Sequence, residues 1–232
     1  MEIDHVFIAT PSREEANAFF NLGFNETQGR RHAGQGTKNR IVRFNNVFLE
    51  FLYLVDKHEA TSSTTSRTQL YQRLTPSRHP TVSPFGVCFR PSINSFSFTM
   101  EYWDYKPSYL PNGVSIPVST QGLEEPMWFF LSFGKAPSNT LNNDDSLIHK
   151  NGAEHVTNVQ LHCAHFSDET KRTLSDIDQL TLLETQRIED QIEESHSPNV
   201  PPNIHLLELE LDNGRQGKTY DLRPNLPLIV SV

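Results

Sequence analysis

The hydrophobic pattern of the first 56 residues predicts one strand, one helix and three further strands. The run 'IDHVFIAT' is short and rich in β-branched residues, as a strand should be. Ser12 and Glu15 have the spacing of a capping box, which predicts a helix start, and Gly23 supplies a left-handed stop. The runs 'FNETQGRRH', 'NRIVRF' and 'VFLEFLYLV' then follow as strands, with a tight turn at Asn45 and Asn46 between the last two. The predicted order is therefore βαβββ.

The pattern becomes polar after this unit and then partly repeats. The runs 'FGVCFRP' and 'PMWFFLSF' restore strands, and the run 'VTNVQLHCAHF' leads into a helix capped by Ser167, with Leu174, Ile177 and Leu180 on one face. The alternation in 'LLELELD' predicts a half-buried strand with its acidic side chains in water. The expected units are a first βαβββ module (1–56), a polar connector (57–84), a second, degenerate module (85–134), another connector (135–154) and a C-terminal region (155–232).

Charge and apolar run length narrow the classes of partner. Lys and Arg total 20 against 28 Asp and Glu, so the formal charge of -8 repels polyanions, and nucleic acid is not an expected partner. The start 'MEIDHVFIAT' lacks the basic residues of a signal peptide, and no run approaches the length of a membrane span. Cys88 and Cys163 lie in apolar strand-like runs and are expected to be free thiols. A cytoplasmic protein with no membrane partner is expected.

The stretch 'GRRHAGQGTKNRIVRF', residues 29–44, combines glycines, a histidine and arginines. It is not a phosphate-binding P-loop, because 'GQGTKN' precedes a strand rather than a helix. One interpretation is a glycine-permitted bend in which Thr37 and Asn39 bond the local backbone. The other is a ligand-binding loop in which His32, Thr37 and Asn39 orient a small molecule, while Arg30, Arg31 and Arg40 attract its anionic groups. Both interpretations stay open.

The unit that opens with Asp4-His5, passes through this stretch and ends on 'FLEFL' resembles the vicinal oxygen chelate superfamily. Within it, the unit is similar to the glyoxalase-like group, whose members carry a His-x-Gly-x-Gly-Thr-x-Asn stretch. The resemblance implies an α+β fold in which βαβββ modules form a curved mixed sheet around a cleft, with an extra C-terminal βαββ region. It also implies that His5 and Glu50 bind a divalent metal (zinc, manganese, nickel or iron) and that Glu50 serves as the catalytic group.

Carrying the pattern to the second module places Phe85 opposite His5 and Ser132 opposite Glu50, and neither is a good metal ligand. A catalytic ion would then need help from another side chain, such as His32, Glu125 or His162.

Two function classes survive. One is a metal-dependent lyase, isomerase or dioxygenase acting on a small oxygen-rich or anionic molecule. The other is a metal-free protein that binds or sequesters such a molecule in the same cleft. A small-molecule ligand is the expected partner in both, and a homodimer is among the assemblies that the sequence allows.

Overall fold

The computed structural model describes the chain except for residues 76–80, 94–96, 140–144 and 186–204. These gaps fall in both connectors, in the second module and in the C-terminal region, so those parts of the sequence-based prediction lie outside the described residues. No helix in the described part is long and apolar enough to cross a membrane.

Eight strands form one curled sheet with the order β2-β3-β4-β1-β5-β8-β7-β6. Their bounds are β1 Glu2–Ala9, β2 Arg31–His32, β3 Thr37–Arg43, β4 Phe48–Leu54, β5 Phe85–Arg90, β6 Tyr102–Tyr105, β7 Ile116–Ser119 and β8 Met127–Phe130. Strand β1 pairs in parallel with β4 and antiparallel with β5, so β1 and β5 join the two modules at the middle of the sheet. The expected fold class, α+β with a curved mixed sheet, is confirmed.

The first module contains the predicted helix, but the helix begins without the predicted cap. It consists of η1 (Glu14–Ala16) and α1 (Asn17–Phe20), and neither has a side-chain capping bond. The carbonyl of Ser12 accepts from Thr10 Oγ1, and Arg13, already helical in its backbone angles, takes the capping position. The capping-box prediction was therefore wrong.

The turn between β3 and β4 also differs from its prediction. Neither Asn45 nor Asn46 adopts a positive φ. The side chain of Asn46 instead donates to the carbonyl of Val156 and accepts from its N–H, at 2.7 and 3.0 Å. This asparagine therefore attaches the first module to the C-terminal sheet, a role that local sequence could not reveal.

The C-terminal region forms a second sheet with the order β10-β9-β11-β13-β12. Its elements are β9 Val156–Cys163, α4 Asp168–Leu174, β10 Leu180–Glu184, β11 Leu206–Leu211, β12 Thr219–Asp221 and β13 Leu228–Ser231. Ser167 caps α4 as predicted, since its hydroxyl accepts from the N–H of Thr170. The helix ends at Leu174, however, and Leu180 opens β10, so these leucines do not share one helical face as expected.

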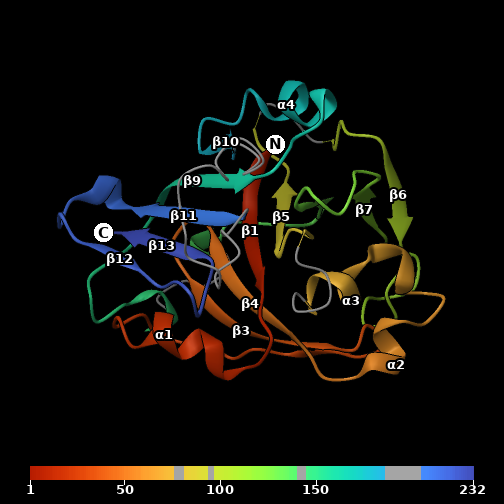
Figure 1. Cartoon of the computed structure of the whole chain (residues 1–232), viewed down its shortest axis with the longest axis horizontal. Helices are drawn as coiled ribbons and strands as arrows, with labels where there is room; N and C mark the ends of the chain where they lie inside the picture. Colours follow the sequence, from red (N-terminus) through yellow and green to blue (C-terminus); the bar gives the residue numbers. More distant parts are fainter. Residues whose placement is uncertain (76–80, 94–96, 140–144, 186–204) are drawn as a thin grey trace, which may run out of the picture.

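The two faces of the first sheet have different roles. One face packs against the second sheet in the main core, which combines residues such as Val6, Phe85 and Trp128 with Leu161 and Leu209. Figure 1 shows this arrangement, with β9, β11 and β13 on one side of β1 and the short helices α2 (Lys57–Ala60) and α3 (Leu70–Arg73) on the other. The opposite face of the sheet carries a second hydrophobic cluster, which joins Phe7 and Phe129 to Leu70 of α3.

Both cysteines are free, as predicted, and both are buried. Burial raises the pKa of the Cys163 thiol to about 12 and raises the pKa of Cys88 well above its usual range. Both thiols are therefore protonated at neutral pH, as expected of packed rather than reactive cysteines.

Stability should fall as the solution is acidified below about pH 6.5, and His149 should contribute to the loss. Its Nδ1 accepts from the N–H of Asn25 and its Nε2 donates to the carbonyl of Arg43, both at 3.0 Å, so protonation would break the first bond. Burial lowers the pKa of His149 below its ordinary value of 6.5. The unfolded chain therefore takes up a proton first, and the free energy of unfolding drops by at most about 1.4 kcal/mol per pH unit for this group.

Urea unfolding at pH 7.5, 6.5 and 5.5 measures this dependence. His149→Gln retains a donor and an acceptor but does not titrate, so its stability should depend less steeply on pH. Burial also lowers the pKa values of His32 and His205, so part of the dependence should remain in the variant. Parallel pH profiles for the two proteins would refute the role of His149.

Candidate functional site

A cleft opens on the free face of the first sheet and is lined by both modules. Its lining residues are His5, Phe7, Arg30, His32, Gln35, Glu50, Leu52, Leu70, Tyr105, Tyr109, Leu110, Ile116, Met127, Phe129, Leu131 and Phe133. The cavity volume is about 140 Å³. A cavity of about 150 Å³ lined by apolar side chains holds one benzene molecule, so this cleft encloses a group the size of a single ring. Its polar groups come from the first module and the tyrosines, whereas the strands of the second module add mainly apolar walls.

His5 lies on β1 with one ring nitrogen fixed and the other facing the cleft. Its ring stacks on Phe48 at 4.2 Å between centroids and meets Phe129 edge-on at 5.4 Å. Its Nδ1 lies 2.7 Å from Asp4 Oδ1. Since an ionised carboxylate only accepts, Nδ1 carries the proton, and the Nε2 of a neutral ring keeps its lone pair.

The Asp4 side chain can reach His5 because the pairing of β1 with β5 is irregular at these residues. Adjacent residues of a regular strand point to opposite faces. The pairing of β1 with β5 shifts register between Ile3 and His5, as a bulge does. This shift explains how neighbouring side chains on one strand can bond to each other.

Glu50, on β4, is the acidic residue among those that line the cleft, and it is 6 % exposed. Its Oε1 accepts from Asn39 Nδ2 at 2.7 Å. Its Oε2 lies 3.7 Å from His5 Nε2, and its Oε1 lies 4.0 Å from His32 Nε2. The carboxylate thus lies between two imidazoles, and both ring nitrogens are farther away than a hydrogen bond allows.

His32 comes from the glycine-containing stretch identified in the sequence, at the end of β2. Its Nδ1 lies 2.9 Å from Thr37 Oγ1, and the same oxygen accepts from Gln35 Nε2 at 2.8 Å. The hydroxyls of Tyr105 and Tyr109 both donate to Gln35 Oε1. Burial lowers the pKa of His32, and the positive charge of Arg30 lowers it further against the opposing effect of Glu50. His32 is therefore held as a neutral ring at neutral pH.

The loop that presents His32 is held by its glycines and by one carboxylate. Gly34 and Gly36 have φ values of +78° and +77°, and a Cβ on Gly36 would lie 2.1 Å from the carbonyl of Asp56. The N–H groups of both glycines donate to Glu59 Oε2, at 2.9 and 3.0 Å. Glycine is therefore required at position 36, and the loop is an ordered part of the site.

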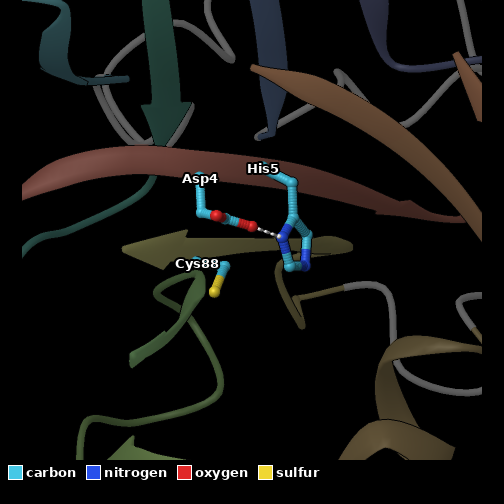
Figure 2. A group of neighbouring side chains, drawn as sticks. All are labelled: Asp4, His5 and Cys88. Atoms are coloured by element: carbon cyan, nitrogen blue, oxygen red, sulfur yellow. Dashed lines mark hydrogen bonds and ion pairs between the residues drawn. The ribbon is translucent and has the colours of Figure 1, made fainter. Parts of the chain in front are cut away.

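Three potential metal ligands lie close together on the Nδ1 side of the His5 ring. The ligand atoms of Asp4, His5 and Cys88 all lie within 4.8 Å of one another, and the three residues are buried. Figure 2 shows the Asp4–His5 bond on β1, with Cys88 beneath it on β5. Arg90 Nη1 also lies 3.7 Å from Asp4 Oδ2. Asp4 is thus already partnered on both oxygens.

The structure brings five of the six predicted site residues together and leaves one elsewhere. His5, Glu50, His32 and Asn39 are linked by the contacts above, and Thr37 lies directly behind His32. Arg40 is on the opposite side of β3 from Asn39. Its guanidinium binds both oxygens of Glu26, Asn17 Oδ1 and the carbonyl of Arg13, and it stacks on Phe20. Arg40 therefore does not reach the cleft.

Of the three arginines expected to attract anionic groups, Arg30 is the one that lines the cleft. It lies beside Tyr109, with its guanidinium carbon 5.4 Å from the centre of that ring. Its guanidinium has no ion-pair partner in the described part of the chain. Arg31, the next residue, instead pairs with Glu59 and Asp56 on the outside of the loop.

The second module's contribution needs one correction. Phe85 belongs to the core between the sheets and Ser132 follows the end of β8, so neither is the counterpart of a first-module ligand. Cys88 is the cross-strand partner of His5, and Phe129 is the residue of β8 that contacts the His5 ring. The described lining from β5 to β8 contains no carboxylate and no imidazole.

The other two candidate ligands, Glu125 and His162, are not among the residues that line the cleft. Glu125 accepts from the N–H of Ser167, from Thr170 Oγ1 and from Trp128 Nε1, at the start of α4. His162 lies on β9, with its Nε2 2.8 Å from Glu208. Both therefore have structural partners of their own.

Sequence inspection missed several residues that shape the site. Asp4, Gln35, Glu59 and Tyr109 each contact a predicted site residue or its loop, yet they come from four different segments. Only Asp4 is adjacent to a candidate in the sequence, and regular strand geometry would have pointed it away.

Comparison with known proteins adds a family and a fold. The model of the glyoxalase-like domain family matches residues 3–92. Among curated proteins, none matches the chain. The crystal structure of a hypothetical protein from Staphylococcus aureus has a similar fold, with a TM-score of 0.58 and 8 % sequence identity, and the match covers 99 % of this chain and 97 % of that chain. At such low identity the likeness concerns the fold alone. The family match, by contrast, includes Asp4, His5, His32, Glu50 and Cys88.

Proposed function

Residues 3–92 form a glyoxalase-like domain of the vicinal oxygen chelate type, and on that premise we propose that the cleft binds a divalent metal and a small oxygen-rich ligand. His5 and Glu50 hold the ion in this proposal, as the family pattern implies. The protein would then be a metal-dependent lyase, isomerase or dioxygenase. Zinc, manganese, nickel and iron are all suited to an imidazole and carboxylate donor set.

The single observation that supports the proposal is that two hydrogen-bond acceptors, His5 Nε2 and Glu50 Oε2, lie close together in a buried site. Asp4 fixes the tautomer of His5, so a neutral ring directs the lone pair of Nε2 towards Glu50 Oε2, 3.7 Å away. Neither atom can donate to the other. Such an arrangement is costly when buried unless a cation or an added proton lies between the two groups. A divalent ion satisfies both acceptors at once.

The residues around the pair have distinct tasks. Asp4 and Asn39 are positioning residues, since they orient His5 and Glu50 and contact the space between them only through those side chains. A bound ion would act as a Lewis acid on adjacent ligand oxygens. Glu50 is the carboxylate placed to accept or return a proton at the ligand. The walls around this position are mainly apolar.

Arg30 would bind an anionic group of the ligand. It lines the cleft, and its guanidinium is not engaged in an ion pair within the described structure. With manganese bound, oxalate, a dianion that chelates a metal through two of its oxygens, should therefore bind and raise the melting temperature further. Arg30→Gln should weaken oxalate binding by about 10-fold or more, since a charge-assisted hydrogen bond contributes about 1.5–3 kcal/mol.

Arg31→Gln is the matched control, because Arg31 has the same charge but pairs outside the cleft. Calorimetric titration of the manganese-loaded proteins with oxalate compares the three. Equal affinities for wild type and Arg30→Gln would reject Arg30 as an anion-binding residue.

The metal-free alternative rests on the same contacts. A doubly protonated His5 would form ion pairs with Asp4 and Glu50, and the cleft would bind its ligand without an ion. In that case oxalate or an apolar ligand should bind equally well in the presence of a chelator.

A cytoplasmic location is also part of the proposal, since both cysteines are free.

A further inference from the structure

We propose that His32 is the third metal ligand, so that the metal centre is built by the first module alone. The inference rests on the proposed function, because it assigns a residue to the same ion. Together, His5, His32 and Glu50 would hold the ion with two imidazoles and one carboxylate. All three residues line the cleft, where a ligand could bind through its oxygens.

The distances carry the first step. His5 Nε2 lies 3.7 Å from one oxygen of Glu50, and His32 Nε2 lies 4.0 Å from the other. Ligand atoms that share one zinc ion at bond lengths of about 2.0–2.2 Å lie roughly 3–4 Å apart. Each imidazole nitrogen thus lies near a different oxygen of Glu50 and is too far from it for a direct hydrogen bond. The ligand atoms of the three residues do not all lie within 4.8 Å of one another, so the side chains must draw together to share one ion.

The nitrogen that His32 presents is determined by its neighbours. Thr37 Oγ1 contacts Nδ1 at 2.9 Å, so Nε2 is the atom that faces Glu50. With Nδ1 protonated and donating to Oγ1, Nε2 keeps its lone pair for an ion. His5 is oriented in the same way by Asp4. Each of the two imidazoles is therefore held through Nδ1 by a polar partner behind it, an arrangement typical of metal-binding histidines.

His32 is also fixed by a preorganised loop. Glu59 binds two loop N–H groups, and Gln35 bonds to Thr37 behind the ring. His32 is 5 % exposed and borders the cleft beside Tyr109, with ring centroids 5.1 Å apart. A loop held by so many contacts costs little further ordering when an ion binds.

The competing set is Asp4, His5 and Cys88, which uses the other nitrogen of His5. An ion there would have to displace the proton that bonds Nδ1 to Asp4 and deprotonate a fully buried thiol. The lining from the second module offers Met127, Phe129 and Leu131 instead of nitrogen or carboxylate donors. His32 is therefore the candidate that can complete the site without breaking a described hydrogen bond.

The test compares metal affinities of single variants. Calorimetric titration with Zn²⁺ and Co²⁺ should give a dissociation constant for wild type that rises at least 10-fold in His32→Ala and in His32→Gln. His149→Gln is the control for removing a buried histidine outside the cleft and should bind as wild type does. Circular dichroism establishes that each variant is folded, and His32→Gln can retain the contact with Thr37 if the alanine variant is not.

Spectra identify the ligands independently of affinity. The Co²⁺ complex should lack the charge-transfer absorption of a thiolate, and Cys88→Ala should leave its visible spectrum unchanged, whereas His32→Gln should alter it. Equal affinity and an equal spectrum for wild type and both His32 variants would overturn the inference while leaving the proposed function intact. A thiolate band that disappears in Cys88→Ala would also overturn it. Absence of metal binding by wild type would overturn both.

Discussion

Replacing Glu50 by alanine is expected to lower the affinity for a divalent metal by at least about 100-fold. Loss of an outer-shell partner of a metal site typically costs 10- to 100-fold, and Glu50 would contact the ion directly. In the absence of metal, Glu50→Ala should be at least as stable as wild type. The Glu50 carboxylate is buried and receives one described hydrogen bond, from Asn39, so removing this carboxylate relieves a desolvation cost.

Melting curves with and without Mn²⁺, Zn²⁺ or Ni²⁺ measure both effects together. Glu26→Ala is the matched control, since Glu26 is a carboxylate on the other side of β3 that pairs with Arg40. The control should lose stability yet keep its response to metal. A Glu50→Ala protein that still shifts its melting temperature with metal as wild type does would show that Glu50 is not a ligand.

Arg73→Met is expected to destabilise the protein by about 3 kcal/mol, which corresponds to a fall of about 6–12 °C in melting temperature. Arg73 lies on α3 and is 3 % exposed. Its Nη1 donates to the carbonyls of Ser83 and Glu125, at 2.7 and 2.8 Å. Methionine fills similar volume but leaves both carbonyls buried without a donor. Burial lowers the pKa of Arg73 to about 10, so the charge is retained at neutral pH.

Arg67→Met provides the comparison, because Arg67 lies nearby on η2 (Ser66–Thr68) and stacks on Trp103 at the surface. It should cost less than about 1 kcal/mol. Urea unfolding of the three proteins at pH 7.5 measures the difference. Similar losses in both variants would mean that the carbonyls around Arg73 find other donors, and that this arginine does not fix α3 to the second module.

The fold could be predicted for those segments whose own hydrophobic pattern determines the secondary structure. The strands that became β1, β4 and β11 have the alternation or apolar content that a sheet dictates, and their predictions are confirmed. Strand β7 was missed, because 'IPVS' is short and contains Pro117, which reads as a break. Leu180 was assigned to a helix because its spacing fits both elements, and pairing with β9 decided in favour of a strand.

The candidate site could be predicted only as far as strand alternation and the family motif reach. The family resemblance implied that His5 and Glu50 share one face of adjacent strands, and in the structure they lie 3.7 Å apart on the paired strands β1 and β4. Strand alternation could not place Asp4 beside His5, because a register irregularity does this, and it could not distinguish Arg30 from Arg40. That choice depends on Glu26 and Asn17, which come from another segment and engage Arg40 fully on the opposite side of β3.

The central claim is that the cleft holds a divalent ion on His5 and Glu50, and metal binding by the wild-type chain tests it most directly. The protein should be purified without a metal-binding tag, treated with a chelator, and titrated calorimetrically with Mn²⁺, Zn²⁺ and Ni²⁺. We expect one ion per chain for at least one of these metals, with binding lost in His5→Ala. Failure of all three to bind, or equal binding by His5→Ala, would contradict the claim and favour the metal-free protein.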